Sequence, residues 1–215
     1  MLACERTGSA EGSVAANDYH FITHWRVPGR IDDVAAILGD PLDLPRWWPS
    51  VYLTVRELAP GDSEGRGRVV DLYTKGWLPY TLRWRFQVTE LDPPRRIALE
   101  ASGDFVGRGV WTLEQEGETA HAIYDWRLRA EKPLLRRLSF LLKPLFAANH
   151  RWAMAQGERS LRLELARRAA PAAERAQLPP PPGPASGRPL ALGAAGLAAG
   201  VALLLAGRRG WRRRG

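Results

Sequence analysis

The strongest constraint on the fold is a strict two-residue alternation of apolar and polar side chains in the middle of the chain. Residues 81–88 alternate between large apolar side chains and threonine, arginine or glutamine, and residues 122–129 repeat the pattern. Successive side chains of a β-strand point to opposite faces of the sheet. The alternation therefore predicts strands with one buried face and one solvated face.

Further strands are predicted where weaker alternation lies between turn residues. Glycine, proline and aspartate cluster at 60–62, 92–94, 102–104 and 116–118 and predict the turns. The additional strands are predicted at 19–27, 51–59, 66–75, 96–102 and 106–116. Seven short strands joined by short turns predict a meandering antiparallel sheet.

Helical spacing replaces this alternation near both ends of the strand region. Residues 31–38 carry an apolar stripe, with Asp32 and Asp33 in the first turn, where the helix dipole favours acids. A long helix is predicted from Pro133 toward Arg168, with a kink or break at Pro144. Its predicted inner stripe contains Leu138, Leu141, Leu142, Leu145, Ala148, Asn149, Trp152, Gln156, Arg159 and Leu163.

Composition excludes several classes of protein. The single cysteine, Cys4, rules out a disulfide framework and a cysteine-based zinc site. The formal net charge of +8 is concentrated at the end of the chain, since residues 171–215 hold seven arginines and one acid, Glu174. Because the preceding 170 residues are nearly neutral, we expect no nucleic-acid partner.

Changes in composition divide the chain into five segments. Residues 1–18 are small and polar and are expected to form a flexible N-terminus. Residues 19–170 form the folded domain, and residues 171–188 are rich in proline, which predicts an extended linker without helix. Residues 189–207 are apolar, and residues 208–215 form a basic tail.

The apolar segment predicts a single transmembrane helix. Residues 189–207 contain no charged side chain and would span about 28 Å as a helix, close to the thickness of a bilayer core. Gly196 and Gly200 are spaced for a weak homodimer contact between such helices. No secretory signal precedes the domain, so we expect it on the cytoplasmic side, although the arginines after residue 207 favour the opposite orientation.

Six segments occur in an order typical of one superfamily. They are 27–34 (VPGRIDDV), 47–51 (WWPSV), 99–105 (LEASGDF), 107–111 (GRGVW), 146–154 (FAANHRWAM) and 157–158 (GE). Together with the order of predicted elements, they resemble the START, Bet v 1 and polyketide cyclase (SRPBCC) superfamily, in particular its polyketide cyclase/dehydrase-like branch. The resemblance implies an α+β helix-grip fold, in which a curved antiparallel sheet wraps a long C-terminal helix and leaves a cavity.

Such a cavity would be lined by inward strand positions and by the inner stripe of the helix. Many of these inward positions hold aromatic side chains. For any single aromatic side chain the alternative is that it fills the core, but a set of them suits a flat or elongated apolar ligand. The expected ligand-binding residues are Tyr73, Trp84, Phe86, Trp111, Tyr124, Trp126, Asn149 and Trp152.

Two polar residues of the long helix are candidate catalytic groups. Asn149 would orient a ligand carbonyl or hydroxyl, or else tie the helix to the sheet. His150 would act as a general acid or base, form a structural hydrogen bond, or lie exposed. We expect no cofactor and no metal, because His20 and His24 lie about 13 Å apart on one strand.

Three functions are compatible with these features. The first is a membrane-tethered binding module for a hydrophobic or aromatic small molecule, such as a lipid or a polyketide-like compound. The second is a cyclase or aromatase that uses acid–base groups in the same cavity. The third is an interaction scaffold whose interior is filled by its own tryptophans. Cavity volume separates the third function from the other two.

Overall fold

The computed structural model describes residues 17–131 and 133–185. The elements, in chain order, are β1 (Asp18–Pro28), α1 (Ile31–Leu38), the 3-10 helix η1 (Pro41–Asp43), α2 (Leu44–Trp47), β2 (Tyr52–Ala59), β3 (Val69–Lys75), β4 (Thr81–Asp92), β5 (Arg96–Gly103), β6 (Phe105–Glu116), β7 (Thr119–Ala130), α3 (Pro133–Ala169) and α4 (Ala172–Arg175).

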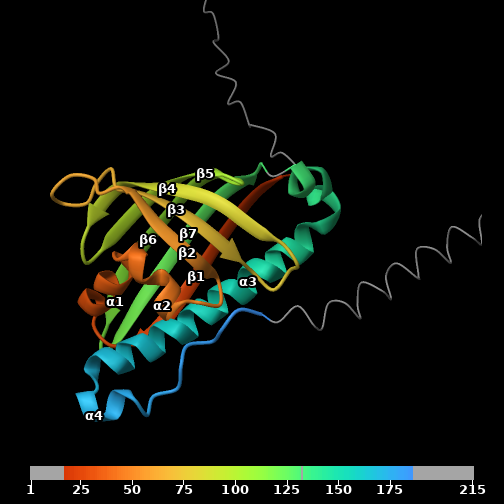
Figure 1. Cartoon of the computed structure of the whole chain (residues 1–215). Coiled ribbons are helices and arrows are strands. Elements are labelled where there is room, and N and C mark those ends of the chain that lie inside the picture. Colours follow the sequence, from red (N-terminus) through yellow and green to blue (C-terminus); the bar gives the residue numbers. More distant parts are fainter. Residues whose placement is uncertain (1–16, 132, 186–215) are drawn as a thin grey trace, which may run out of the picture.

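The seven strands form one antiparallel sheet in the order β1-β7-β6-β5-β4-β3-β2. Strands β2 to β6 each pair with the next strand of the chain, and β1 pairs with β7. The sheet is curved, α3 runs along its open side, and α1 and α2 lie near one end (Figure 1). This arrangement confirms the predicted meander and the helix-grip architecture.

The proline-rich stretch is not purely extended. One helical turn, α4 (Ala172–Arg175), lies within it, so the expectation that residues 171–188 contain no helix is wrong. The turn is compatible with the sequence because proline is concentrated in residues 179–184 and does not occur in residues 172–175. After α4 the chain runs back beside α3 (Figure 1), and the Lys75 ammonium donates to the carbonyl of Ala185 at 3.1 Å.

Several expected features fall outside the described residues. These are most of the N-terminus, the apolar segment 189–207 with Gly196 and Gly200, and the basic tail 208–215. Among the helices of residues 17–131 and 133–185, none combines the length and apolar character needed to cross a bilayer. Helix α3 continues through Pro144, so the helix is not broken at this residue.

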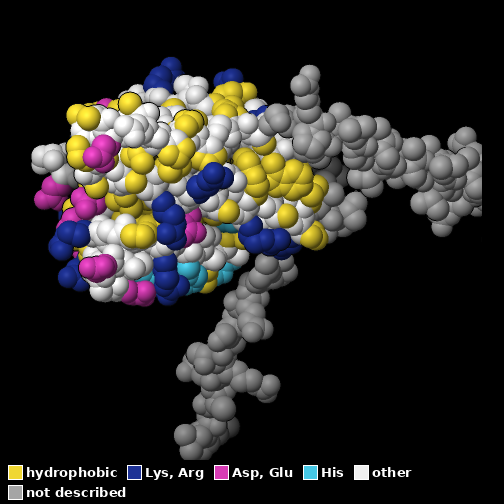
Figure 2. Space-filling model, turned by 90° about the horizontal axis from the view of Figure 1, so that it is seen from below, with side chains coloured by type: hydrophobic (Ala, Val, Ile, Leu, Met, Phe, Trp, Pro, Cys, Tyr) yellow, Lys and Arg dark blue, Asp and Glu magenta, His cyan; other side chains and the backbone are white. Residues whose placement is uncertain are grey.

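The surface carries charges of both signs. On the face seen in Figure 2, lysine and arginine are interspersed with aspartate and glutamate rather than gathered into one basic area. Nucleic-acid-binding domains present a continuous basic patch or stripe. The distribution on this face agrees with the nearly neutral composition of the domain.

A buried carboxylate fixes α3 to α2. Glu164 is 2% exposed, and its oxygens accept hydrogen bonds from Arg46 at 2.6 and 2.8 Å and from Arg168 at 2.8 Å. Burial tends to raise the pKa of Glu164, but the hydrogen bonds from the two arginines outweigh it and lower the pKa. The carboxylate is therefore ionised at neutral pH and holds the two helices together.

We expect Arg46→Ala to lower the free energy of unfolding at neutral pH by about 2 kcal/mol. This is less than the ~3–5 kcal/mol usual for breaking a buried pair, because Arg46 is half-exposed and Arg168 stays bonded to the carboxylate. Because folding lowers the pKa of Glu164, the stabilisation is fully present above the ordinary carboxyl pKa of 4.5. It is lost as the pH falls through the lower pKa of the folded state. Denaturant unfolding at neutral and acid pH should therefore show a smaller penalty in acid.

The matched control is Arg30→Ala. Arg30 pairs with Asp32 at 3.1 Å, but both side chains are exposed. Exposed pairs contribute at most about 1 kcal/mol. Equal losses of stability in the two variants would show that Glu164 does not depend on Arg46.

Candidate functional site

The concave side of the sheet does not close completely on α3. Two neighbouring cavities, of about 140 Å³ and about 220 Å³, lie between them and share Trp48, Tyr52, Trp84, Tyr124 and Met154 as lining residues. Each is smaller than the ~300–1,000 Å³ of typical ligand pockets, but together they reach the lower end of that range. This unfilled volume argues against a scaffold whose interior is filled by its own tryptophans.

The two cavities occupy different ends of the interior. The first is bordered by residues 74–76, Tyr80 and the part of α3 around Asn149. The second extends toward η1, the β2–β3 turn and strands β4 to β6. Since they share lining residues, we treat them as two chambers of one site.

Strand alternation correctly places most of the predicted aromatic residues inward. Trp84 and Tyr124 line both chambers, Trp126 lines the first, and Phe86 and Trp111 line the second. Trp111 stacks on Tyr124 at 4.3 Å between ring centroids, and Tyr124 stacks on Trp126 at 5.6 Å. The Trp84 indole N–H donates to Thr74 Oγ1 at 3.0 Å, which fixes its ring.

Two of the predicted ligand-binding residues line neither chamber. Tyr73 lies on the opposite face of β3, because its neighbours Leu72 and Thr74 are the buried ones, and the Arg83 guanidinium covers its ring at 5.0 Å. Trp152 is partly buried but is not part of either lining. Both expectations are therefore corrected.

Trp152 was misplaced because the inner stripe of α3 is rotated relative to the prediction. The residues of α3 that line the chambers are Phe146, Asn149, His150, Ala153 and Met154. One turn further, Gly157 is buried, and a Cβ there would lie 2.3 Å from the Trp48 ring. The inward face is thus set partly by a residue without a side chain, which no apolar periodicity can reveal.

Asn149 ties the helix to a loop. Its Oδ1 accepts hydrogen bonds from the backbone N–H groups of Trp77 at 2.9 Å and Leu78 at 3.2 Å. Gly76 packs so closely that an added Cβ would lie 2.2 Å from Oδ1. This geometry favours the structural alternative for Asn149, although the residue also borders the first chamber.

Of the two candidate catalytic residues, His150 is better placed than Asn149 to contact a bound molecule. Its imidazole lines the first chamber and stacks on Phe21 at 4.1 Å with 15° between the rings. Its Nε2 is buried and has no hydrogen-bond partner among the described residues. Burial, and secondarily the charge of Arg151, lowers the pKa of His150 to about 4. The ring is therefore neutral at physiological pH.

Two tyrosines add hydroxyl groups to the lining, and sequence reasoning selected only one of them, Tyr124. Charged side chains also border the site, Lys75 in the first chamber and Glu64 and Arg68 in the second. Tyr52 and Tyr124 border both chambers, and burial raises the pKa of both phenols. Their hydroxyls are therefore protonated donors at neutral pH. Tyr52 was missed because it lies on a strand whose alternation is weak, so only its position after the WWPSV segment pointed toward the site.

Comparison with known proteins agrees with this geometry. Residues 22–166 match the family model described as polyketide cyclase/dehydrase and lipid transport. The chain belongs to this family. No curated protein sequence matches the chain.

Solved structures share the fold of this polyketide cyclase/dehydrase and lipid transport family member. The Zhui aromatase/cyclase from Streptomyces sp. R1128 is 19% identical with a TM-score of 0.57, and the alignment covers 72% of this chain and 98% of that one. TTHA0849 from Thermus thermophilus is 17% identical with a TM-score of 0.54, covering 66% and 97%. The di-domain ARO/CYC StfQ of the steffimycin pathway is 16% identical with a TM-score of 0.54, covering 72% and 52%.

We expect the imidazole of His150 to take up a proton only near pH 4, as followed by NMR of histidine-labelled protein, with His150→Gln assigning the signal. Because folding lowers this pKa from 6.5, the unfolded chain binds the proton first. The wild type should therefore lose about 3 kcal/mol more stability than His150→Gln between neutral pH and about pH 4. A titration midpoint near the ordinary histidine value would contradict the buried position.

Proposed function

We propose that this protein holds a hydrophobic or aromatic small molecule, such as a lipid or a polyketide-like compound, in the two chambers. The observation that carries the proposal is the row of stacked rings beside unfilled volume, formed by Trp111, Tyr124 and Trp126. Aromatic side chains offer a large apolar contact area at a low cost in side-chain entropy. The family description, which includes lipid transport, supports the same function.

The polar groups nearest the stacked rings suit an uncharged part of the ligand. The buried Nε2 of His150 is available to a hydroxyl or carbonyl of the ligand, and the Tyr52 and Tyr124 hydroxyls border both chambers. A charged ligand group beside these three side chains would leave water without a countercharge, whereas Lys75 borders the first chamber and Glu64 and Arg68 border the second. The part of the site around the stacked rings therefore favours an uncharged part of the ligand.

The alternative is an enzyme of the cyclase or aromatase type. The family description and the likeness to the Zhui aromatase/cyclase support it. Such an enzyme needs an acid or base with a pKa near the working pH. The pKa of His150 is about 4, and Asn149 Oδ1 is already bonded to two backbone N–H groups. These observations favour binding over turnover.

We further propose that residues 189–207 tether the domain to a membrane from its cytoplasmic side, with Gly196 and Gly200 as the contact of a weak homodimer. Lys75 lines the first chamber and holds the carbonyl of Ala185, so the chain leaves the described region beside that chamber. A membrane-soluble ligand would then be concentrated where the cavity lies. The uncharged composition of the segment supports this arrangement.

We expect Trp126→Leu to weaken binding of an uncharged fluorescent probe such as Nile red by about tenfold, because the chamber loses a stacked ring. Native mass spectrometry should detect a small molecule on the purified wild type and less of it on this variant. The control is Tyr73→Leu, which removes an aromatic ring from the opposite face of the sheet. Equal losses in both variants would contradict binding in the chambers, and a co-purified molecule converted on incubation would favour the enzyme.

We expect the full chain to sediment with membranes and the chain ending at residue 185 to remain in the supernatant, because only the former has the apolar segment. Protease added to intact cells should leave residues 19–170 undigested. Recovery of the full chain in the supernatant would contradict the tether. Digestion of the domain in intact cells would show that the orientation is the opposite one.

A further inference from the structure

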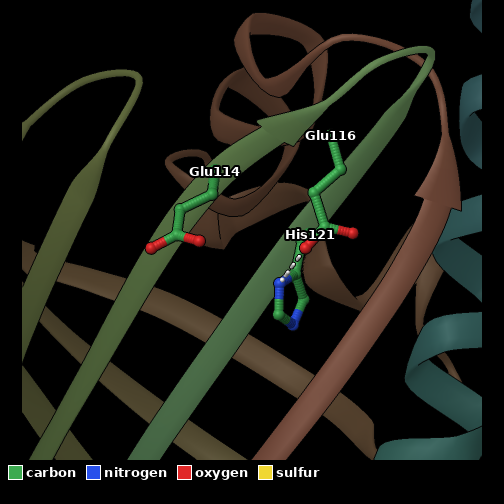
Figure 3. Close-up of side chains that lie close together, drawn as sticks. All are labelled: Glu114, Glu116 and His121. Carbon is green, nitrogen blue, oxygen red and sulfur yellow. Dashed lines mark ion pairs between the residues drawn. The ribbon is translucent and has the colours of Figure 1, made fainter.

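A second cluster of functional side chains lies on the outer face of the sheet, away from the chambers. Glu114 and Glu116 are two residues apart on β6, and His121 on β7 is the register partner of Glu114. Figure 3 shows the three side chains on one face of the hairpin, with Glu116 reaching the imidazole. Each offers a metal-ligand atom, and these atoms all lie within 4.8 Å of one another.

The contact between Glu116 and His121 has the spacing of two ligands. Oε1 lies 3.0 Å from Nδ1, yet Nδ1 makes no hydrogen bond of acceptable geometry. Two donor atoms bound to one Zn²⁺ at tetrahedral to octahedral angles lie about 2.9–3.4 Å apart. The two atoms form an ion pair when the imidazole is protonated (Figure 3), and their separation also fits two ligands of one ion. His121 is only 6% exposed, so this nitrogen is held against the carboxylates.

A second histidine supports the orientation of the imidazole. His24 Nδ1 lies 3.0 Å from His121 Nε2. When Nε2 carries the proton and donates it to His24, the Nδ1 lone pair of His121 faces the two carboxylates. Metal-binding histidines commonly donate their other ring N–H to an acceptor in this way.

The charges around the cluster leave it net negative. Arg26 is a cationic side chain that lies against Glu116, with its Nε 3.2 Å from Oε2. Arg26 binds Oε2 of Glu116 and leaves Oε1 toward His121. Glu114 is exposed, and the structure shows no hydrogen bond or ion pair to it from the described residues. One arginine therefore opposes two carboxylates.

We propose that Glu114, Glu116 and His121 bind one divalent cation of borderline hardness, such as Zn²⁺. One imidazole nitrogen with two carboxylate oxygens suits such an ion better than Mg²⁺, which prefers an all-oxygen octahedron. The site lies across β6 and β7 from the chambers and does not depend on the proposed ligand. The expectation of no metal considered His20 and His24 of one strand, whereas this cluster joins two strands.

The test is calorimetric titration of the full chain with Zn²⁺ near neutral pH, with any histidine tag removed. Every variant carries Cys4→Ser, because a free thiolate also binds Zn²⁺. We expect one bound ion and an affinity lowered about tenfold or more by Glu114→Gln. The matched control is Glu100→Gln, which is also an exposed position, on β5, and should leave the affinity unchanged. Bound Zn²⁺ should also raise the melting temperature of the wild type but not of Glu114→Gln.

Arg26→Gln supplies an independent test. Its side chain competes with the ion for Glu116, so its removal should strengthen Zn²⁺ binding. A purely structural role of the cluster predicts no gain. Failure of the wild type to bind Zn²⁺, or equal binding by the wild type and Glu114→Gln, would overturn the proposal.

Discussion

Unfilled volume in an interior costs stability, so the walls that enclose it must be held in position by other contacts. Helix α3 is held by polar contacts at two points. Asn149 accepts two backbone hydrogen bonds from the β3–β4 loop, and the buried carboxylate of Glu164 is bonded to Arg46 of α2. Met154 lies between these two residues in α3 and borders both chambers. The spacing of helix and sheet, and with it the chambers, depends on these directional bonds.

This construction also sets the chemistry of the interior. Burial keeps His150 and Tyr124 neutral beside the apolar rings and the unfilled volume, as the lowered pKa of His150 and the raised pKa of Tyr124 show. Neutral donors and acceptors recognise oxygen atoms of an uncharged molecule without the desolvation cost of a buried charge. An acid–base mechanism at neutral pH would need a group whose pKa lies closer to the working pH.

Local patterning was sufficient to predict the sheet and the inward direction of Trp84, Phe86 and Trp126, since alternation fixes which face of a strand is buried. It was insufficient for α3. There the large apolar Trp152 lies outside the linings, while Gly157 faces inward because Trp48 occupies the space of its missing side chain. The role of Asn149 rests on backbone groups more than 70 residues away in sequence. Such long-range contacts leave no periodic signal in the chain.

The two lowered pKa values act in different ranges of pH. A group whose pKa is lower in the folded state begins to destabilise the fold when the pH drops below its unfolded value. That value is 6.5 for His150 and 4.5 for Glu164. Between these two values, of these two groups, only His150 lowers the stability, because the unfolded chain takes up the proton while the folded imidazole stays neutral down to about pH 4. Protonation of the folded protein would place a charge beside Phe21 inside the first chamber, and an apolar ligand opposes that charge. Mild acid therefore lowers the stability of the fold while His150 in the chamber stays neutral, and ligand binding weakens only as the pH approaches 4.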